Sequence, residues 1–152
     1  MRHIEVQANA VGRTAAEVYR IICDFERYQE YSDAVRNVTI TDTHEDYSVS
    51  KWEVNFREGI LKWTEKDYFT PDTFSIRFQQ IEGDAEHFSG QWLLADTEKG
   101  CLIRFIADFD MGIPSLSDLI DPIAEQALRE NIQSILTGLL CGQVEFVSTN
   151  ST

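Results

Sequence analysis

The chain has 152 residues, 43% of them hydrophobic, so it is long enough for one folded domain and too apolar for a disordered chain. Its formal net charge of -13 argues against DNA, RNA or an anionic membrane as the main partner, because each would repel the average surface. The three cysteines lack CxxC spacing, which argues against a disulfide framework or zinc site and indicates a cytoplasmic location. With no apolar signal region or membrane-length run, we expect one domain over residues 1–147, a flexible tail over 148–152 and no membrane insertion.

The first part of the chain predicts one strand and two short helices. Residues 3–11 alternate between apolar and polar side chains, which is typical of a β-strand. Thr14 and Glu17 then have the spacing of a capping box, which predicts a helix to about Phe25. The next segment, FERYQEYSDAV, indicates a short second helix and a turn.

From residue 35 the hydrophobic period changes to two, which is typical of strands. Turn residues separate the alternating runs, and the connections are short enough for hairpins, so the pattern predicts an antiparallel meander. The six predicted strands are Val35–Thr43, Tyr47–Phe56, Ile60–Phe69, Phe74–Ile81, Phe88–Ala95 and Cys101–Phe109.

A long helix is predicted from Asp121 to about Cys141, because apolar residues recur there at three- and four-residue spacing. Asp121 can cap its first turn, and Pro122 fits the first helical position, where a missing N–H costs nothing. Asn131 lies on the apolar face, either as a core amide with satisfied hydrogen bonds or as a ligand contact. Gly138 either lets a strand approach closely or frays the helix end.

The element order is strand, two short helices, six strands and a long helix, which predicts an α+β fold. A seven-stranded antiparallel sheet can hide one face under a single long helix only if the sheet curves. Wide curvature leaves space that side chains need not fill, and such space is a natural pocket for an apolar ligand.

Three stretches of sequence carry a resemblance to a known family. They are CDFERYQEYSDAVRNVTI, LKWTEKDYFTPD and HFSGQWLLADTEKGCLIRFIADFDM. With the element order, they resemble the START-like helix-grip superfamily, in particular its polyketide cyclase/dehydrase (aromatase/cyclase) and coenzyme Q-binding branch, over residues 3–141. The resemblance implies a helix-grip fold with a deep cavity between the sheet and the C-terminal helix. In the cyclase members this cavity folds a poly-β-keto chain and guides aldol closure and dehydration, and no metal or redox cofactor is implied.

Alternation along the strands, with the family's tryptophan carried onto Trp63, assigns an interior face to the sheet. All three tryptophans and most of the nine phenylalanines fall on that face, where they either line a cavity or simply fill the core. Aromatic walls suit a flat polycyclic or polyene ligand. The candidate ligand-binding residues are Trp52, Phe56, Trp63, Phe78, Trp92, Phe105, Tyr31 and Ile135.

Glu65 and Asp67 fall on the same interior face as Trp63. Two neighbouring buried carboxyl groups titrate apart, which leaves one neutral acid and one base. Such a pair can remove a proton beside a carbonyl and protonate a leaving hydroxyl, so Glu65 and Asp67 are candidate catalytic residues, with Asn131 holding a carbonyl. The alternative places Asp67 in solvent at the strand end and pairs Glu65 with a neighbouring basic residue.

The sequence departs from aromatase-type relatives at several positions. These relatives commonly place an arginine where Asp67 aligns, can carry a histidine where Ala107 aligns, and sometimes place an acid at Ile135, whereas a nearby asparagine matches Asn131. Without the arginine, the obvious cation for an enolate or oxyanion is missing. The departure leaves either a cyclase with different acid–base groups or a binder. The three histidines lack metal-ligand spacing, so no metal site is predicted.

Three functions therefore stay open: a cyclase acting on a polycarbonyl intermediate, a non-catalytic carrier of a quinone, lipid or natural product, and a protein that sequesters a toxic metabolite. Polyketide substrates usually arrive on an acidic acyl carrier protein, which makes that protein a candidate partner. Arg13, Arg20 and Arg27 are spaced by seven residues and form either a solvated charged face or the basic patch such a partner needs. We expect a monomer or a homodimer.

Overall fold

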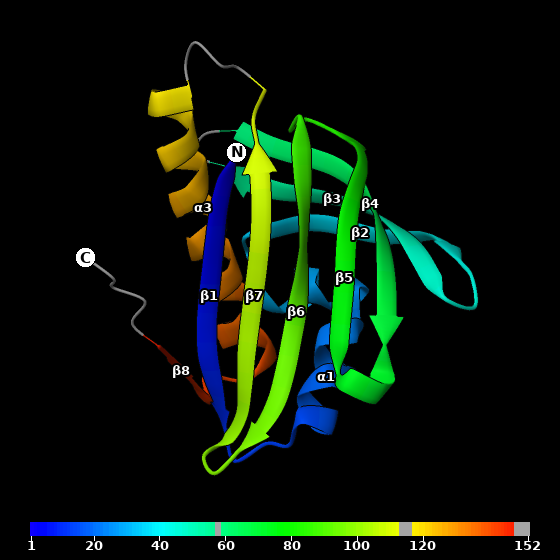
Figure 1. Cartoon of the computed structure of the whole chain (residues 1–152), viewed down its shortest axis with the longest axis vertical. Coiled ribbons are helices and arrows are strands. Elements are labelled where there is room, and N and C mark those ends of the chain that lie inside the picture. Colours follow the sequence, from blue (N-terminus) through cyan, green and yellow to red (C-terminus); the bar gives the residue numbers. More distant parts are fainter. Residues whose placement is uncertain (57–58, 113–116, 148–152) are drawn as a thin grey trace.

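A computed structural model describes residues 1–56, 59–112 and 117–147 of the chain (Figure 1). The tail predicted over 148–152 lies outside the described residues. The first elements are β1 (Arg2–Val11), α1 (Ala15–Cys23), the 3₁₀ turn η1 (Phe25–Arg27) and the one-turn helix α2 (Tyr28–Tyr31). The next are β2 (Val35–Thr43), β3 (Tyr47–Phe56), β4 (Gly59–Thr70), the 3₁₀ turn η2 (Pro71–Thr73) and β5 (Ser75–Gly83). The last are β6 (His87–Thr97), β7 (Gly100–Asp110), α3 (Ser117–Leu139) and β8 (Val144–Phe146).

The strands form one antiparallel sheet in the order β2-β3-β4-β5-β6-β7-β1-β8. The prediction of a curved antiparallel sheet with a long C-terminal helix and two short helices after the first strand is confirmed. The predicted count of seven strands is wrong by one, because β8 extends the sheet beyond β1. With three residues, β8 is too short for alternation to reveal it in the sequence.

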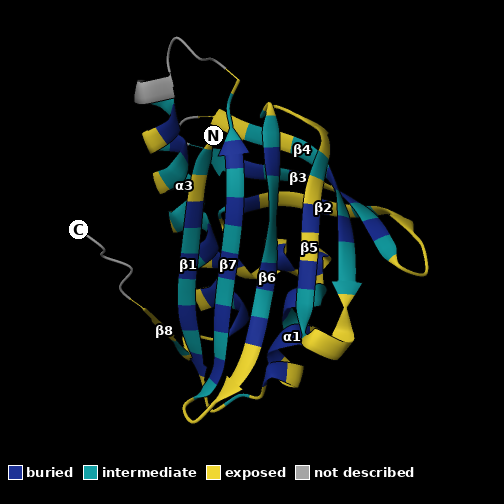
Figure 2. Cartoon of the chain, in the orientation of Figure 1, coloured by how far each residue is buried: buried dark blue, intermediate teal, exposed yellow. Residues whose placement is uncertain are grey.

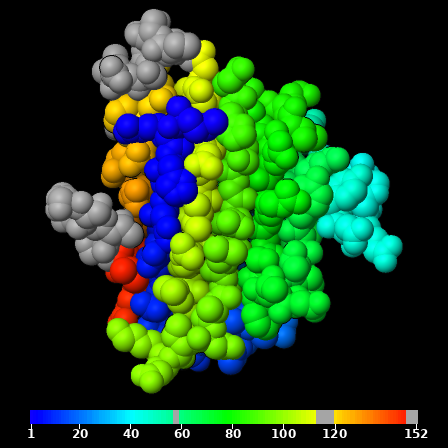
Figure 3. Space-filling view, viewed as in Figure 1, coloured from blue at the N-terminus to red at the C-terminus, as the bar shows by residue number. Residues whose placement is uncertain are grey.

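The sheet curls around the helices. Figure 1 shows β1, β7, β6 and β5 side by side, with β2 and β3 crossing behind them and α3 lying beside β1. Buried and less buried residues alternate along β1 and β7, as the colours in Figure 2 show, so one face of each strand points to the core. The opposite face of these strands forms a continuous outer surface in Figure 3. The interior therefore lies between the concave face of the sheet and α3.

The N-cap half of the capping box predicted for the first helix is confirmed: the backbone N–H of Glu17 donates to Oγ1 of Thr14 at 3.1 Å. The carboxylate of Glu17 accepts from the hydroxyl of Thr14 at 3.3 Å and not from its backbone N–H. The helix ends at Cys23, and Phe25 starts the 3₁₀ turn that leads into α2. This short irregular connection places α2 against the interior, where Tyr28 is buried.

The start predicted for the last helix is wrong by four residues. Helix α3 begins at Ser117, so Asp121 is a buried residue inside the helix and does not cap it, and Pro122 lies in the interior of the helix. At this position proline cannot donate to the carbonyl four residues earlier, so the second turn of the helix has one backbone hydrogen bond fewer. Aspartate followed by proline is typical of a helix start, but here Asp121 and Pro122 lie about one turn after it.

Of the two alternatives for Gly138, close approach of another backbone is correct. The segment that approaches α3 is α2 and not a strand. A Cβ atom at Gly138 would lie 1.9 Å from the carbonyl oxygen of Tyr31. Next to this contact, Oγ of Ser32 and Oγ of Ser134 are hydrogen-bonded at 2.8 Å. The two helices are therefore held together at the point where α2 meets the interior.

The three cysteines of the chain, Cys23, Cys101 and Cys141, are free thiols. Within the described ranges, no helix combines the length and the apolar character that a membrane crossing requires.

Candidate active site

Two adjoining chambers lie between the concave face of the sheet and α3. Their cavity volumes are about 50 and 60 Å³. The inner chamber extends toward α2, and the outer chamber extends toward Phe56 and Met111. Residues that line both chambers mark the boundary between them: Val54, Trp63, Phe88, Leu128 and Asn131.

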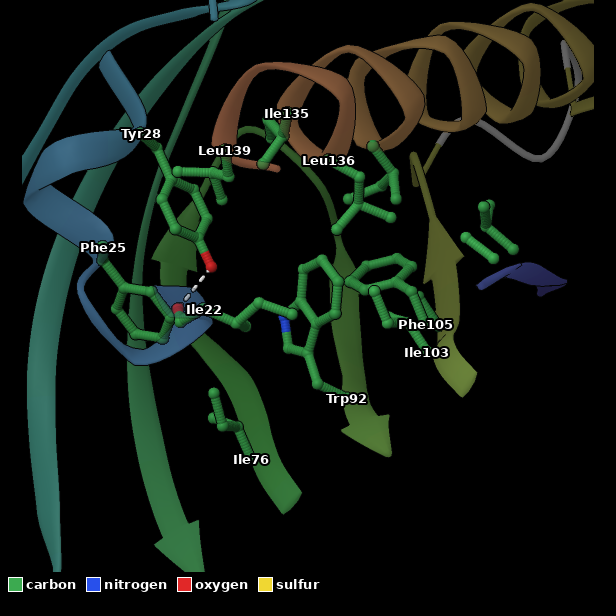
Figure 4. Packing of buried hydrophobic residues seen from close by; sticks show 14 of the residues in the cluster. Ile22, Phe25, Tyr28, Ile76, Trp92, Ile103, Phe105, Ile135, Leu136 and Leu139 are labelled. Carbon is green, nitrogen blue, oxygen red and sulfur yellow. Dashed lines mark hydrogen bonds between the residues drawn. The ribbon is translucent and has the colours of Figure 1, made fainter. Parts of the chain in front are cut away.

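The wall of the inner chamber is mainly aromatic. Its floor comes from the sheet, its roof from α3 and its end from the short helical segment, and Figure 4 shows Ile135 and Tyr28 facing Trp92 across this space. The residues that line it, besides those shared with the outer chamber, are Phe25, Tyr28, Trp52, Glu65, Phe78, Trp92, Phe105, Ile132 and Ile135.

Each chamber has room for only a few water molecules, and both are smaller than the roughly 150 Å³ of an engineered cavity that binds benzene. The aromatic rings pack against one another. The ring of Trp52 is stacked on that of Trp63 with 5.8 Å between the ring centroids, and Trp63 lies edge-on to Phe88 with 5.3 Å between the centroids. The predicted aromatic face therefore both fills the core and lines a cavity. A polycyclic ligand requires some of these rings to move.

Glu65 and Asp67 are both buried, with 4% and 0% of their surfaces exposed. The alternative that put Asp67 in solvent at the strand end is therefore wrong. Among the described residues Glu65 forms no ion pair with a basic side chain, so that part of the alternative is wrong as well. Both carboxyl groups point inward because they lie two residues apart on β4, which pairs with β3 without a bulge; the register shift of β4 against β5 comes before Glu65.

One hydrogen-bond donor to the carboxyl pair comes from β4 itself and one from the neighbouring strand β3. Nε1 of Trp63 donates to Oε1 of Glu65 at 2.6 Å. Ser50 lies opposite Glu65 on β3, and its hydroxyl donates to Oδ2 of Asp67 at 2.6 Å. The same hydroxyl oxygen accepts from Nε1 of Trp52 at 2.8 Å. The carboxyl pair and two tryptophans thus form one buried network.

Burial disfavours the charged form of both carboxyl groups and raises the pKa of each. With both ionised, Oδ1 of Asp67 is buried without a donor among the described residues. Burial raises the pKa of Glu65 well above its usual range, and the charge of Asp67 and a hydrogen bond to it raise it further. Burial also raises the pKa of Asp67, but hydrogen bonds from Glu65 and Ser50 oppose this. We assign one proton to the pair and place it on Glu65, which then donates to Asp67, so that one neutral acid lies beside one base.

Asn131 lies at the boundary between the two chambers. Its Nδ2 donates to the backbone carbonyl of Asn55 on β3 at 3.0 Å. Because a carbonyl can only accept, this bond fixes the orientation of the amide. The side chain therefore has a structural partner and also lines both chambers, and its contact with a ligand stays a prediction.

The structure places most predicted ligand-binding residues on the cavity wall, but not all of them. The prediction that Tyr31 lies on the cavity wall is wrong. Its side chain is 43% exposed, and its hydroxyl accepts from Nη2 of Arg27 at 2.6 Å on the surface. Its backbone packs against Gly138, which directs the ring outward, and Tyr28 takes the interior position. Asp67 lies behind the wall, so only Glu65 of the pair lines a chamber. The residues confirmed as lining are Trp52, Phe56, Trp63, Phe78, Trp92, Phe105, Ile135, Glu65 and Asn131.

Sequence reasoning missed Phe25, Tyr28 and Ser50. The three-residue spacing of Phe25 and Tyr28 in a helical segment was a signal for a shared face. Ser50 shares the strand face of Trp52, and a small polar residue among inward-facing aromatic residues was a signal for a hydrogen-bonded network.

The three arginines spaced by seven residues do not form one patch. Arg20 and Arg27 line a surface hollow of about 270 Å³ whose apolar wall includes Leu139. Arg13 precedes α1 and donates to Gln143 instead, at 3.3 Å. In the part of the chain that the structure describes, no three His, Cys, Asp or Glu side chains are grouped as metal ligands would be.

Comparison with known proteins gives the same architecture. Residues 11–136 match the model of a family described as "Polyketide cyclase / dehydrase and lipid transport". No curated protein matches the chain by sequence.

Solved structures resemble the chain over almost its full length. One is TTHA0849 from Thermus thermophilus, with a TM-score of 0.84 and 20% identity, covering 93% of this chain and 97% of that one. Another is the Zhui aromatase/cyclase from Streptomyces sp. R1128, with a TM-score of 0.81 and 20% identity, covering 93% of each chain. A third is a START superfamily protein from Mycobacterium smegmatis, with a TM-score of 0.76 and 15% identity, covering 91% and 96%. At these identities the structures show a shared fold.

Proposed function

Because the chain belongs to the polyketide cyclase/dehydrase and lipid transport family, we propose that it binds a polycarbonyl or polycyclic aromatic intermediate in the cavity under α3 and promotes ring closure. The observation that carries the proposal is the buried carboxyl pair of Glu65 and Asp67 beside an aromatic chamber. A fold that only needed a core would gain nothing from two buried acids, because burying them costs free energy.

The pair supports acid–base chemistry without a cofactor. When the shared proton moves to Asp67, Glu65 becomes a carboxylate on the chamber wall and can remove a proton from a carbon between two carbonyls. The resulting carbanion attacks a second carbonyl, and the alkoxide takes a proton from the pair, which returns to one proton. In dehydration the pair gives one proton to the leaving hydroxyl and receives one from the adjacent carbon, so water leaves and the pair is again unchanged.

The other groups of the site position the substrate. Asn131 lies where a chain spanning both chambers would pass, and its amide can hold a carbonyl there. Aromatic side chains on both sides favour a planar product over an extended chain. The aromatic walls then hold the substrate in the shape that ring closure needs, while the carboxyl pair transfers its protons.

A second candidate function, a non-catalytic carrier or sequestering protein for a quinone, lipid or natural product, is favoured by one observation. Among the described residues that line the inner chamber there is no arginine, lysine or histidine to stabilise an enolate. The carrier uses the same cavity and needs no proton transfer.

Turnover separates the two functions. A synthetic poly-β-ketone is incubated with the wild type and with Asp67→Asn, and formation of the aromatic ring is followed by absorbance. A general acid–base group contributes about 10²–10⁴-fold, so Asp67→Asn should lose most of the acceleration. Its dissociation constant for the product should stay nearly unchanged, because the substitution is almost isosteric.

Asp46→Asn is the matched control, since it removes the same charge from an exposed turn. Wild-type protein that binds the product but does not accelerate its formation would establish the carrier function instead.

The proposed setting is the cytoplasm, with an acyl carrier protein as the substrate donor. The unpaired state of all three cysteines supports the location. The hollow lined by Arg20 and Arg27 supports the partner, because these two positive charges outnumber the one acidic residue of its lining, Asp24.

A further inference from the structure

Three hydrogen-bond donors on the wall of the inner chamber are already engaged within the protein. The hydroxyl of Tyr28 donates to the carbonyl of Ile22, as the dashed line in Figure 4 shows. Nε1 of Trp52 donates to Ser50, and Nε1 of Trp63 donates to Glu65. The remaining residues of the chamber are apolar, except for Glu65 itself, Asn131 at the boundary, and Trp92, whose indole N–H donates no hydrogen bond among the described residues.

Glu65 therefore presents acceptor lone pairs to the chamber. Its proton is directed to Asp67, which lies behind the wall and has an oxygen that needs a donor. Its own oxygens keep lone pairs beyond the one that Trp63 uses. The end of the chamber consequently offers hydrogen-bond acceptors within an apolar, aromatic surround.

We infer that the cavity selects aromatic ligands whose leading end is an uncharged hydrogen-bond donor, a phenolic or enolic hydroxyl, which donates to the carboxyl of Glu65. The inference rests on the proposed function in that it takes this cavity as the ligand site. It extends that function by naming which end of the molecule enters first. A carbonyl placed directly against Glu65 would meet acceptor oxygens there and lose the hydrogen bonds it makes in water.

We expect the donor group of the ligand to be uncharged, because the Glu65 side chain that it meets is neutral. The wall group that the ligand meets is a carboxylic acid, and the negative charge of the pair lies behind it on Asp67, where Ser50 holds it. An ammonium group would have to lose its hydration without reaching that charge directly. A phenol is easily desolvated and fits a narrow space between rings.

Three probes with the same ring system test the inference: 2-naphthol, 2-methylnaphthalene and 2-naphthaldehyde. The methyl group matches the size of the hydroxyl but cannot donate, and the aldehyde offers only an acceptor. Dissociation constants are measured from quenching of tryptophan fluorescence, since all three tryptophans line the cavity. We expect 2-naphthol to bind about tenfold more tightly than either, which is what one hydrogen bond supports.

Glu65→Leu should abolish this preference while still binding 2-methylnaphthalene, because an apolar side chain of similar size replaces the acceptor. Glu45→Leu, at an exposed turn position, is the control and should keep it. The preference of the wild type tests the inference even if Glu65→Leu does not fold.

Equal affinities of the wild type for the three probes would overturn the inference and leave an apolar ligand site intact. Tighter binding of 2-naphthylmethylammonium than of 2-naphthol would overturn the assignment of an uncharged donor. If none of the probes bound, both the inference and the proposed function would fail.

Discussion

Glu65 accepts a hydrogen bond from Trp63 and lies on the cavity wall, whereas Asp67 accepts from Ser50 and lies behind the wall. Both groups are buried, so each has a reason to take up a proton. The difference between them comes from the hydroxyl of Ser50, which stabilises the ionised form of Asp67. Two chemically similar groups two residues apart therefore acquire different roles from one hydroxyl on the neighbouring strand β3.

The raised pKa of Glu65 makes a prediction about stability. The folded protein holds this proton more tightly than the unfolded chain, in which the pKa is near the ordinary 4.5. The stability that the proton contributes is therefore complete at low pH and is lost as the pH rises from about that value toward the raised pKa. Glu65→Gln keeps a neutral donor at this position at every pH. We expect the variant to be more stable than the wild type at pH 8, by about 1–4 kcal/mol.

Urea unfolding of both proteins at pH 5 and pH 8 measures this difference. The advantage of Glu65→Gln should be clearly smaller at pH 5. Glu45→Gln removes an exposed acid and serves as the control for the general effect of lowering a large negative charge. A pH-independent difference for Glu65→Gln would contradict the proton assignment.

At the scale of elements, the position of α2 depends on one glycine. Alanine normally stabilises a helix relative to glycine by up to about 1 kcal/mol. At Gly138, however, the added Cβ would lie 1.9 Å from a backbone oxygen of Tyr31, which cannot move without shifting α2. We expect Gly138→Ala to destabilise the protein by about 1–3 kcal/mol, the cost typical of overpacking.

Thermal and urea unfolding check this expectation, and Gly59→Ala is the control. A Cβ at Gly59 would meet its nearest neighbour, the carbonyl oxygen of Phe56, at an ordinary 3.6 Å. If Gly138→Ala behaved like a common helix substitution and raised the melting temperature, the close approach of the two helices would be refuted.

Elements with a regular period could be predicted from the sequence. The strands from β2 to β7 and the N-cap of α1 follow from alternation and from one local motif, and their ends lie within two residues of the predicted ones. The existence of β8 could not be predicted, because its three residues are recognised only by their pairing with the distant β1. The start of α3 was missed because Asp121 and Pro122 fit a helix start but lie inside the helix.

The candidate site divides in the same way. Parity along the strands placed Glu65, Trp52 and Trp63 on the interior face, since alternation alone decides it. Tyr31 was misplaced because its direction depends on how α2 packs against Gly138, which no local pattern encodes. The protonation of the carboxyl pair depends on Ser50, a partner on another strand.

For the whole molecule, charge decides how a carrier protein can bind. The chain carries a net charge of -13, so an acidic partner is repelled except where basic residues gather. Arg20 and Arg27 gather in one hollow. We expect Arg20→Glu/Arg27→Glu to weaken binding of an acidic acyl carrier protein at least about tenfold at low salt, because reversed charges repel it.

Calorimetric titration at low and at moderate salt measures this effect, and the difference between variants should shrink as salt rises. Lys51→Glu/Lys99→Glu makes the same change in net charge at exposed positions away from the hollow and should bind nearly as the wild type does. Equal loss of binding in both double variants would show that net charge, and not the hollow, governs docking.

The most direct test of the proposed acid–base function is the double variant Asp67→Asn/Glu65→Gln. It keeps the size and the hydrogen-bonding capacity of both side chains and removes every exchangeable carboxyl proton from the pair. The measurement is the rate of aromatic ring formation from a poly-β-ketone, together with the dissociation constant of the product. The proposal predicts a loss of about 10²–10⁴-fold in rate with nearly unchanged binding. Full activity in the double variant would contradict it and leave ring closure to the shape of the cavity alone.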